Sequence, residues 1–134
     1  MPFIELFVPE HKSKTELKCI SDILHDQLVT HFDVPEEDRF HVFHPIASER
    51  RFFDLHYGVS TGQRSKDWIL IKILAGKPRQ PEAKQALYQA LAKSFKAQLG
   101  LATTDLMVVI HFNHISDWSF SEGQSAVLPK EVLL

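Results

Sequence analysis

Hydrophobic residues recur along the chain with two different spacings, and these spacings predict its elements. The stretch PFIELFV, residues 2–8, is apolar and is followed by Pro9, which predicts a buried strand. Residues 13–32 place their apolar side chains at helical spacing: Leu17, Ile20, Leu24 and Leu28. Residues 39–46, RFHVFHPI, predict a second strand. The first third of the chain is therefore expected to form a β-α-β unit.

The same order of elements recurs in the second half of the chain. Residues 67–76 predict a strand that ends at a glycine. The next segment has Pro81 near its start and Gly100 just past its end, which is the asymmetry typical of a helix. Residues 104–114, TDLMVVIHFNH, predict the closing strand. Two similar halves, about 2–46 and 67–114, are therefore expected.

Residues 47–67 connect the two halves, and a C-terminal extension follows the second half. The alternation in FFDLHYGV, residues 52–59, predicts a strand or hairpin arm in the connection. No linker marks a boundary, so residues 1–134 are expected to form a single α+β domain. Tandem β-α-β units predict one mixed four-stranded sheet with two helices on one face. The other face needs a cover, and self-association would supply one.

Composition narrows the classes of function. The chain has 134 residues, 44% of them hydrophobic, and a net charge of −2, which argues against a nucleic-acid partner. No apolar run approaches the roughly 20 residues that span a membrane, and no signal peptide is present. Cys19 is the single cysteine, so no intrachain disulfide can form. A cytoplasmic location without membrane attachment is expected.

The histidines do not predict a metal site. The pairs His41/His44 and His111/His114 have a spacing of three residues, but both fall on predicted strands. Residues three apart on a strand point to opposite faces, so one chain cannot easily aim both at one ion. A glycine-rich phosphate loop and a G-x-S-x-G turn are also missing from the sequence. No metal and no cofactor are expected.

Other residues could perform chemistry near strand ends. Lys77 and Arg79 precede the second helix, where two cations and a helix N-terminus would form an anion site. Asp38 lies at the entry to the second strand, and Trp118 and Phe120 share one side of an extended segment. Taken alone, Lys77, Arg79 and Asp38 fit solvated surface charges better than a site, and Trp118 and Phe120 form either an aromatic wall or part of the core.

The start of the chain has two interpretations. Proline at position 2 can simply begin an edge strand, because it lacks a backbone donor. A small residue after Met1 normally allows the methionine to be removed, and Pro2 would then carry a free secondary amine, which is a base.

Four stretches of the sequence favour the second interpretation. MPFIEL, VPEEDRFHVFHP, KPRQPEAKQALY and ISDWSFSEG lie in the order and spacing of one family. With them the chain resembles the tautomerase superfamily over almost its whole length, and most closely its malonate semialdehyde decarboxylase branch. The resemblance implies a homotrimer of β-α-β-β-α-β subunits, with each active site built around an amino-terminal proline.

The resemblance also implies roles for individual residues. Pro2 matches the catalytic proline, and Asp38 matches the acid that the decarboxylase branch uses beside it. Lys77 and Arg79 fall on that branch's arginine pair, which binds and polarises the substrate. Lys77 departs from the pattern, because lysine offers a point charge without the bidentate fork of arginine. This departure weakens the decarboxylase assignment more than it weakens proline chemistry.

Trp118 and Phe120 match the hydrophobic wall of that branch's active site. The expected function is a cofactor-free tautomerase that acts on a small 2-oxo acid, with Pro2, Asp38 and Arg79 as catalytic residues. One alternative is decarboxylation of malonate semialdehyde, with hydration as a side activity. Another is a binding or signalling protein on the same fold, in which Met1 is retained and Pro2 is vestigial.

Overall fold

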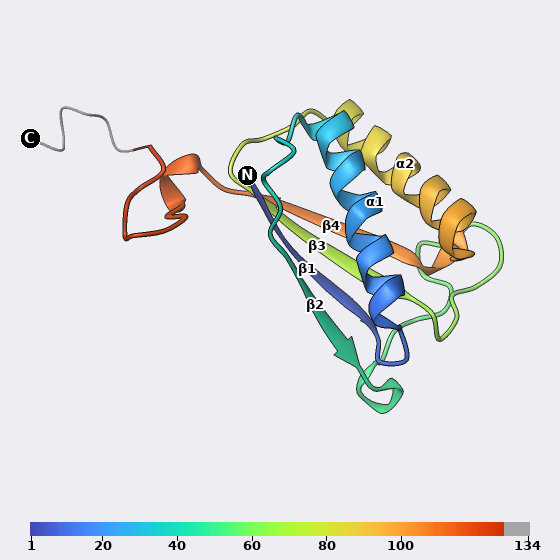
Figure 1. Ribbon diagram of the computed structural model, residues 1–134. Helices are drawn as coiled ribbons and strands as arrows, with labels where there is room; N and C mark the ends of the chain where they lie inside the picture. Colours follow the sequence, from blue (N-terminus) through green and yellow to red (C-terminus); the bar gives the residue numbers. More distant parts are fainter. Residues whose placement is uncertain (128–134) are drawn as a thin grey trace, which may run out of the picture.

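The computed structural model describes residues 1–127, and in it two helices cover one face of a four-stranded sheet (Figure 1). The strands lie in the order β2-β1-β3-β4. The elements are β1 (Pro2–Pro9), α1 (Lys14–Phe32), β2 (His41–Ile46), β3 (Ile69–Ala75), α2 (Pro81–Leu99) and β4 (Leu106–Phe112). The predicted α+β class and the tandem β-α-β order are therefore confirmed.

The sheet is mixed, and its register decides which chain ends meet. The outer pairs β1–β2 and β3–β4 are parallel, whereas β1 and β3 are antiparallel and place Pro2 opposite Ala75. The start of β1 therefore lies beside the start of β2 and the ends of β3 and β4. Pro45 lies within β2, which is tolerated because β2 is an edge strand.

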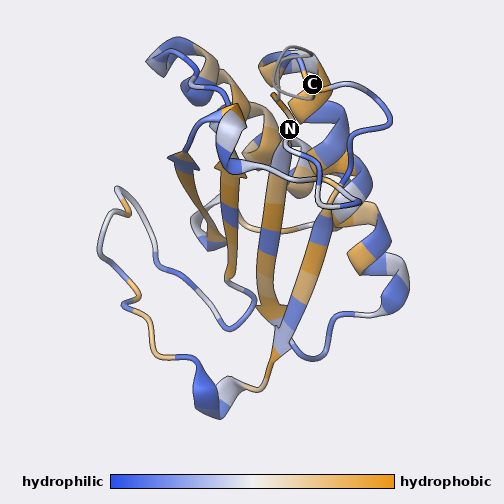
Figure 2. Cartoon of the chain, turned by 90° about the vertical axis from the view of Figure 1, so that its left-hand side faces the viewer, coloured by the Kyte–Doolittle hydropathy of each residue, from blue (hydrophilic) through white to orange (hydrophobic). Residues whose placement is uncertain are grey.

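The core lies between the sheet and the helices. In β1 and β3 every second side chain is buried against the helices, and Figure 2 shows the strands as mostly hydrophobic, interrupted by hydrophilic positions. The helices contribute the apolar residues that face them: Ile20, Ile23, Leu24, Leu28, Phe32, Leu87, Leu91 and Phe95. Truncating a fully buried member such as Leu91 to alanine is expected to cost about 2–5 kcal/mol.

Local signals fix the helix ends. At α1, Ser13 accepts a hydrogen bond from the Glu16 amide and Glu16 accepts one from the Ser13 amide, both at 3.1 Å, so the capping box is complete. Helix α2 begins at Pro81 and is followed by Gly100 in the left-handed conformation, with φ of 67°. Among residues 1–127, no helix is both long enough and apolar enough to cross a membrane.

The sheet face away from α1 and α2 is only partly covered by the other described residues. It carries apolar side chains on both edge strands, and Val42, Met107 and Val109 are 47%, 41% and 44% exposed. Glu5 lies at the centre of this face, within 3.3 Å of His44 and 3.8 Å of Lys72. The open face is therefore apolar at its edges and charged at its centre.

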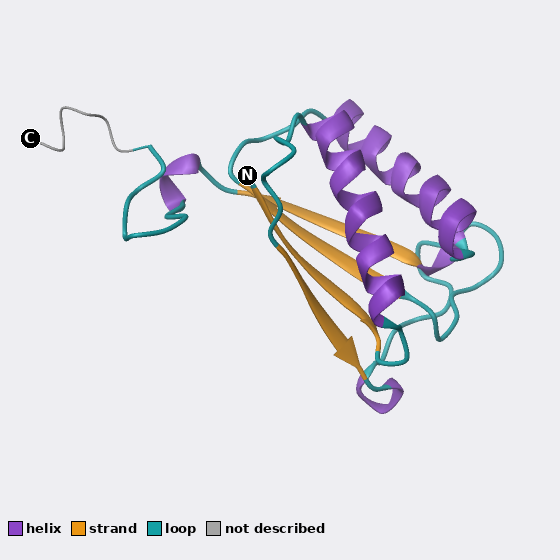
Figure 3. Ribbon diagram, in the orientation of Figure 1, coloured by secondary structure: helices purple, strands orange, loops and turns teal. Residues whose placement is uncertain are grey.

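The predicted strand or hairpin arm at residues 52–59 was wrong. This part of the connection forms turns and loop (Figure 3), and Phe52 and Tyr57 are 93% and 84% exposed. The physical reason is Asp54, whose carboxylate accepts hydrogen bonds from the amides of His56 and Tyr57 at 2.9 and 2.7 Å. Such a local turn competes with strand pairing for the same backbone groups.

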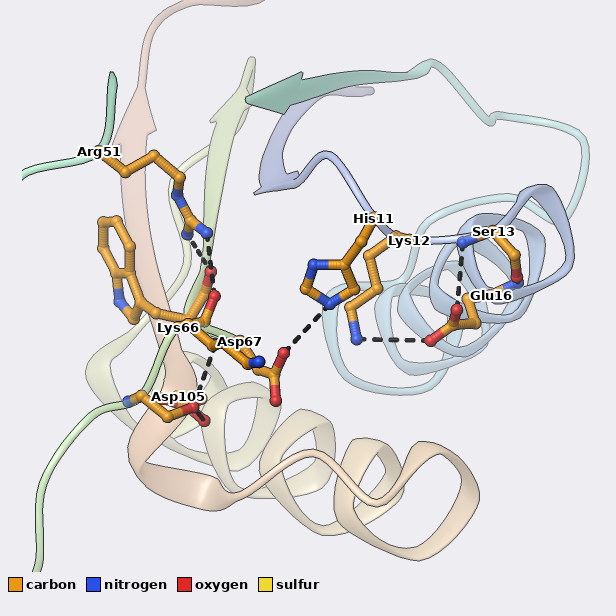
Figure 4. A network of polar contacts seen from close by, with 10 residues as sticks. His11, Lys12, Ser13, Glu16, Arg51, Lys66, Asp67 and Asp105 are labelled. Carbon is orange, nitrogen blue, oxygen red and sulfur yellow. Dashed lines mark hydrogen bonds and ion pairs between the residues drawn. The ribbon is translucent and has the colours of Figure 1, made fainter. Parts of the chain in front are cut away.

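Polar contacts fix the connection to the sheet at the end opposite Met1 (Figure 4). Asp105, only 2% exposed, accepts hydrogen bonds from the Ser65 amide and hydroxyl, both at 2.6 Å. Arg51 donates to the carbonyl groups of Lys66 and Trp68. Both Asp105 oxygens are thus paired, as a buried carboxylate requires.

Candidate active site

The first site residue is Asp38, in the segment between α1 and β2. Its carboxylate forms an ion pair with the terminal amine of Met1 through Oδ2. The Asp38 side chain is 13% exposed, and its other oxygen, Oδ1, is buried without a hydrogen-bond partner among residues 1–127. A half-satisfied buried carboxylate costs free energy, which is a common sign of a functional group.

Met1 also lines a cavity of about 290 Å³ between the end of α1 and the segment before α2. Lys77 and Arg79 line the same cavity, as the sequence predicts. The remaining lining comes from Phe32, Asp33, Pro35 and Pro78. Two cationic side chains and one acid therefore line the cavity beside the first residue, and the excess of positive charge makes it suited to an anion.

Arg79 is held in place by the end of α1. Its guanidinium carbon lies 5.0 Å from the centre of the Phe32 ring, and Nη2 donates to the Phe32 carbonyl. Nη1 donates to the Lys77 carbonyl at 2.5 Å. Burial lowers the pKa of Arg79, and nearby Asp33 opposes this shift. An arginine remains charged at all physiological pH values, so this shift leaves a fixed, partly desolvated cation.

Trp118 and Phe120 line a second cavity of about 400 Å³, with Phe3, Phe40 and Val42 among the other lining residues. The Trp118 and Phe120 rings are stacked with centroids 5.6 Å apart, and the centroid of Phe40 lies 6.1 Å from that of Phe120. This cavity is mainly aromatic, which suits an apolar group.

Gly76 allows Trp118 to lie at this position. A Cβ atom on Gly76 would lie 2.7 Å from the indole nitrogen of Trp118, closer than nonbonded atoms approach. The same nitrogen donates to Asn113 Oδ1 at 2.7 Å, which fixes the ring. Glycine at the end of β3 is therefore a packing requirement of the aromatic cavity.

Pro2 lies between the two cavities along the chain. Met1 lines the cationic cavity and Phe3 lines the aromatic cavity. Pro2 itself is buried opposite Ala75 and lines neither cavity while Met1 precedes it. The structure thus places Asp38 against the terminal amine, places Lys77 and Arg79 on one cavity with Met1, and places Trp118 and Phe120 on a second cavity with Phe3.

His41 lines the aromatic cavity at the start of β2. Burial, with further contributions from Arg39 and His25, lowers the pKa of His41 to about 4. The ring is therefore neutral at pH 7. His44, three residues further along β2, lies on the open sheet face beside Glu5, whereas His41 contacts Ser21 of α1 on the other face. The prediction that these two histidines point to opposite faces of the sheet is therefore confirmed.

Sequence reasoning missed three residues of this region. Phe40 could have been found, because it lies two positions from Asp38 in an extended segment. Gly76 was expected only to end a strand, and its closeness to Trp118 has no local signal. Phe32 was expected only as the last residue of the first helix, and the position of its carbonyl depends on where α1 ends.

The family model described as "Tautomerase enzyme" matches residues 38–121. The chain belongs to the tautomerase family. It is 31% identical to the probable tautomerase YrdN of Bacillus subtilis (strain 168), over 96% of this chain and 97% of the relative. It is also 27% identical to the probable tautomerase YusQ of the same organism, over 96% and 99%.

Solved structures agree with this membership. FG41 malonate semialdehyde decarboxylase inhibited by 3-bromopropiolate is similar at a TM-score of 0.83 and 28% identity, over 92% of each chain. A fused 4-OT protein described as a symmetric trimer has a TM-score of 0.73 at 19% identity, over 92% of this chain and 95% of the other. The second likeness concerns the fold alone. The resemblance to the decarboxylase branch of the tautomerase superfamily is thus confirmed.

Proposed function

We propose that this tautomerase family member catalyses keto-enol exchange of a small 2-oxo acid without a cofactor, with Pro2 as its base. The observation that carries the proposal is the ion pair between the chain's terminal amine and Asp38, beside a cavity lined by Lys77 and Arg79. Removal of Met1 would move the terminal amine by one residue, onto the proline nitrogen.

The cations would bind the substrate carboxylate. Arg79 and Lys77 face the cavity from the segment that leads into α2, and the amides of the first helical turn add positive potential there. A fixed, partly desolvated guanidinium binds a carboxylate more strongly than a solvated one. The substrate would thus be anchored with its oxo carbon toward the terminal amine.

Proton transfer would then follow at Pro2. In the enol-to-keto direction, the proline nitrogen takes the proton of the enol hydroxyl, and the oxygen electrons form the carbonyl. The electrons of the carbon–carbon double bond then form a C–H bond at the carbon next to the carbonyl, with the proton that the protonated proline returns. One O–H bond breaks, one C–H bond forms, and the amine is regenerated. Asp38, already paired with the terminal amine, would stabilise the protonated state.

Trp118 and Phe120 would contact the apolar part of the substrate. Their stacked rings line the cavity that Phe3 also lines, whereas the two cations line the cavity that Met1 lines. A substrate with a carboxylate at one end and an apolar group at the other fits this arrangement.

A homotrimer is part of the proposal. The open sheet face exposes Val42, Met107 and Val109 among residues 1–127, and fused 4-OT proteins of the same fold are described as trimers. Burying such a face against copies of the chain would remove this apolar surface from water. Analytical ultracentrifugation should give three times the chain mass of 15.4 kDa, and a monomer at micromolar concentration would contradict it.

The similarity to malonate semialdehyde decarboxylase favours a second candidate, which is decarboxylation of a 3-oxo acid. Loss of carbon dioxide leaves an enolate that a polarised carbonyl stabilises. Lys77 lacks the bidentate fork that holds a carboxylate in one orientation, so we rank this activity second. Efficient malonate semialdehyde turnover that Asp38→Asn abolishes would reverse the ranking.

The enol of phenylpyruvate is a suitable probe of the tautomerase. Pro2→Ala should lower kcat/KM by about 100-fold, since general acid–base groups contribute 10²–10⁴-fold. Pro9→Ala is the matched control, because Pro9 ends the same strand at its far end, and it should leave turnover unchanged. Near-normal turnover in Pro2→Ala would overturn the proposal.

A further inference from the structure

A polar stripe on α1 holds the segment that contains Asp38. Ser21 Oγ lies 2.8 Å from His41 Nδ1, and Asp22 accepts a hydrogen bond from Arg39 at 2.6 Å. One turn further along the helix, His25 contacts the same segment before Asp38. Contacts from α1 therefore flank Asp38 on both sides in the sequence.

His25 makes the most buried of these contacts. Its side chain is only 4% exposed, and its Nε2 lies 2.6 Å from the carbonyl oxygen of Glu36. A carbonyl can only accept, so Nε2 carries the proton and donates. The other ring nitrogen, Nδ1, is buried and has no partner among residues 1–127. Leaving a polar atom unpaired costs about 1–3 kcal/mol.

That cost is not required by the helix pattern. His25 directly follows Leu24 on the buried side of α1, where an aliphatic residue would pack without an unpaired atom. What histidine adds is a single donor that reaches across to the backbone of the next segment. The contact with Glu36 is therefore the feature that distinguishes histidine from leucine at this position.

The contact acts on the turn that carries Asp38. The Asp38 amide donates to the Pro35 carbonyl at 3.0 Å, which closes a turn over residues 35–38. Glu36 is the second residue of this turn, and His25 fixes its carbonyl. The Asp38 carboxylate has one partner, the terminal amine, and its Oδ1 has none among the described residues. The position of this carboxylate therefore depends on the backbone of the turn together with its single ion pair.

We infer that His25 is a positioning residue for Asp38: through the Glu36 carbonyl it holds the turn that aims the carboxylate at the terminal amine. This inference rests on the proposed function, since it assumes that Asp38 acts beside Pro2. His25 lines neither the cavity beside Met1 nor the aromatic cavity. The sequence motifs did not select it as a site residue. Its effect on catalysis should pass entirely through Asp38.

Three variants test the inference with the enol of phenylpyruvate. His25→Leu keeps a similar volume and removes the donor, and should lower kcat by about 3- to 5-fold, no more than Asp38→Asn does, with KM within about twofold, because a small misplacement of a catalytic group reduces turnover without removing the anchor. His25→Gln places an amide nitrogen near the Nε2 position and should restore most of kcat. His31→Leu is the matched control on the same helix, with no side-chain hydrogen bond among residues 1–127, and should behave as wild type.

A double-mutant cycle separates positioning from general destabilisation. In an Asp38→Asn background, His25→Leu should cause less than about a twofold further loss, because residues that act through each other are not additive. An equal loss of kcat in both backgrounds would overturn the inference. Wild-type kcat in His25→Leu would also overturn it.

Hydrogen exchange gives a readout that needs no turnover. His25→Leu should speed exchange of the Asp38 amide, whereas His31→Leu should not. Unchanged exchange in His25→Leu would overturn the inference even if Pro2 is catalytic. Raised exchange in His25→Leu together with full turnover in Pro2→Ala would instead overturn the proposed function and leave the His25 contact established.

Discussion

The two ends of the sheet contain similar groups arranged for different purposes. Each end has an arginine, a carboxylate and a cavity, of about 290 Å³ beside Met1 and about 280 Å³ beside Arg51. At the end that contains Arg51, called the far end, both oxygens of Asp105 are paired with Ser65. At the end that contains Met1, called the near end, Asp38 pairs one oxygen with the terminal amine and leaves the other unpaired among residues 1–127.

The arginines differ less than the carboxylates. Arg51 and Arg79 each donate to two backbone carbonyls and lie over an aromatic ring. Arg79, however, shares its cavity with Met1, Lys77 and one acid, Asp33, whereas Arg51 and Lys66 share theirs with two acids, Glu10 and Glu49. A partly buried arginine is therefore not by itself a site. An unpaired carboxylate oxygen and an excess of cationic groups distinguish the end that can bind an anion.

The arginines should give the largest contrast. Arg79→Ala should lower kcat/KM for the enol of phenylpyruvate by on the order of 2–4 kcal/mol, or about 30- to 1000-fold, since a desolvated charged pair with the substrate is lost. Arg51→Ala should retain turnover but lose about 2–3 kcal/mol of unfolding free energy, because its carbonyl partners lose a charged donor. Steady-state kinetics and urea unfolding measure both. Equal kinetics for Arg79→Ala and wild type would contradict the account.

The carboxylates should separate in the same way with smaller effects. Asp105→Ala should cost about 2–3 kcal/mol of unfolding free energy, because it leaves the Ser65 amide and hydroxyl without their buried acceptor. Asp38→Asn should change stability little and slow enol-keto exchange about 3- to 10-fold, since Pro2 still moves the proton. A loss of stability in Asp38→Asn as large as that in Asp105→Ala would show that both carboxylates are structural.

Gly76→Ala tests the wall of the near end. The new methyl group would meet the Trp118 indole, so we expect about 1–3 kcal/mol of destabilisation and a shift in tryptophan fluorescence. Gly62→Ala is the control: a Cβ atom there would have no other atom within 4 Å, but the φ of +82° strains alanine. Turnover should fall only in Gly76→Ala. Unaltered fluorescence and turnover would show that Trp118 does not depend on this glycine.

His41 should give the smallest effect. Its pKa is about 4 in the folded chain against 6.5 for a free histidine, so the unfolded chain binds more protons between these values. Its contribution to stability is therefore complete above pH 6.5 and is lost as the pH falls toward 4. Between pH 7 and pH 5, wild type should lose about 1 kcal/mol more than His41→Asn, after allowance for partial exposure. Identical losses in urea unfolding would contradict this.

Much of the fold could be predicted because its signals are local. Ser13 and Glu16 mark one helix start, and Pro81 and Gly100 bracket the other helix, so element order followed from spacing. The connection was wrong because a single side chain, Asp54, forms a turn inside an alternating pattern.

The site was less accessible to sequence reasoning. That Lys77 and Arg79 lie close together could be predicted, since both directly precede a helix start, and both line one cavity. The unpaired oxygen of Asp38 and the contact between Gly76 and Trp118 could not be predicted, because they depend on segments distant in sequence. His25 could not be predicted as a site residue for a related reason. It lies on the buried side of α1 beside Leu24, and its contact with Glu36 depends on how the next segment folds back on the helix.

The central claim is that the near end becomes catalytic when its terminal amine belongs to Pro2. The most direct test compares one chain in two forms, with Met1 removed and with Met1 retained, each verified by mass spectrometry of the intact protein. The form that begins at Pro2 should turn over the enol of phenylpyruvate at least about 100 times faster, because an amide nitrogen at Pro2 is not a base. Equal kcat/KM for the two forms would contradict the account.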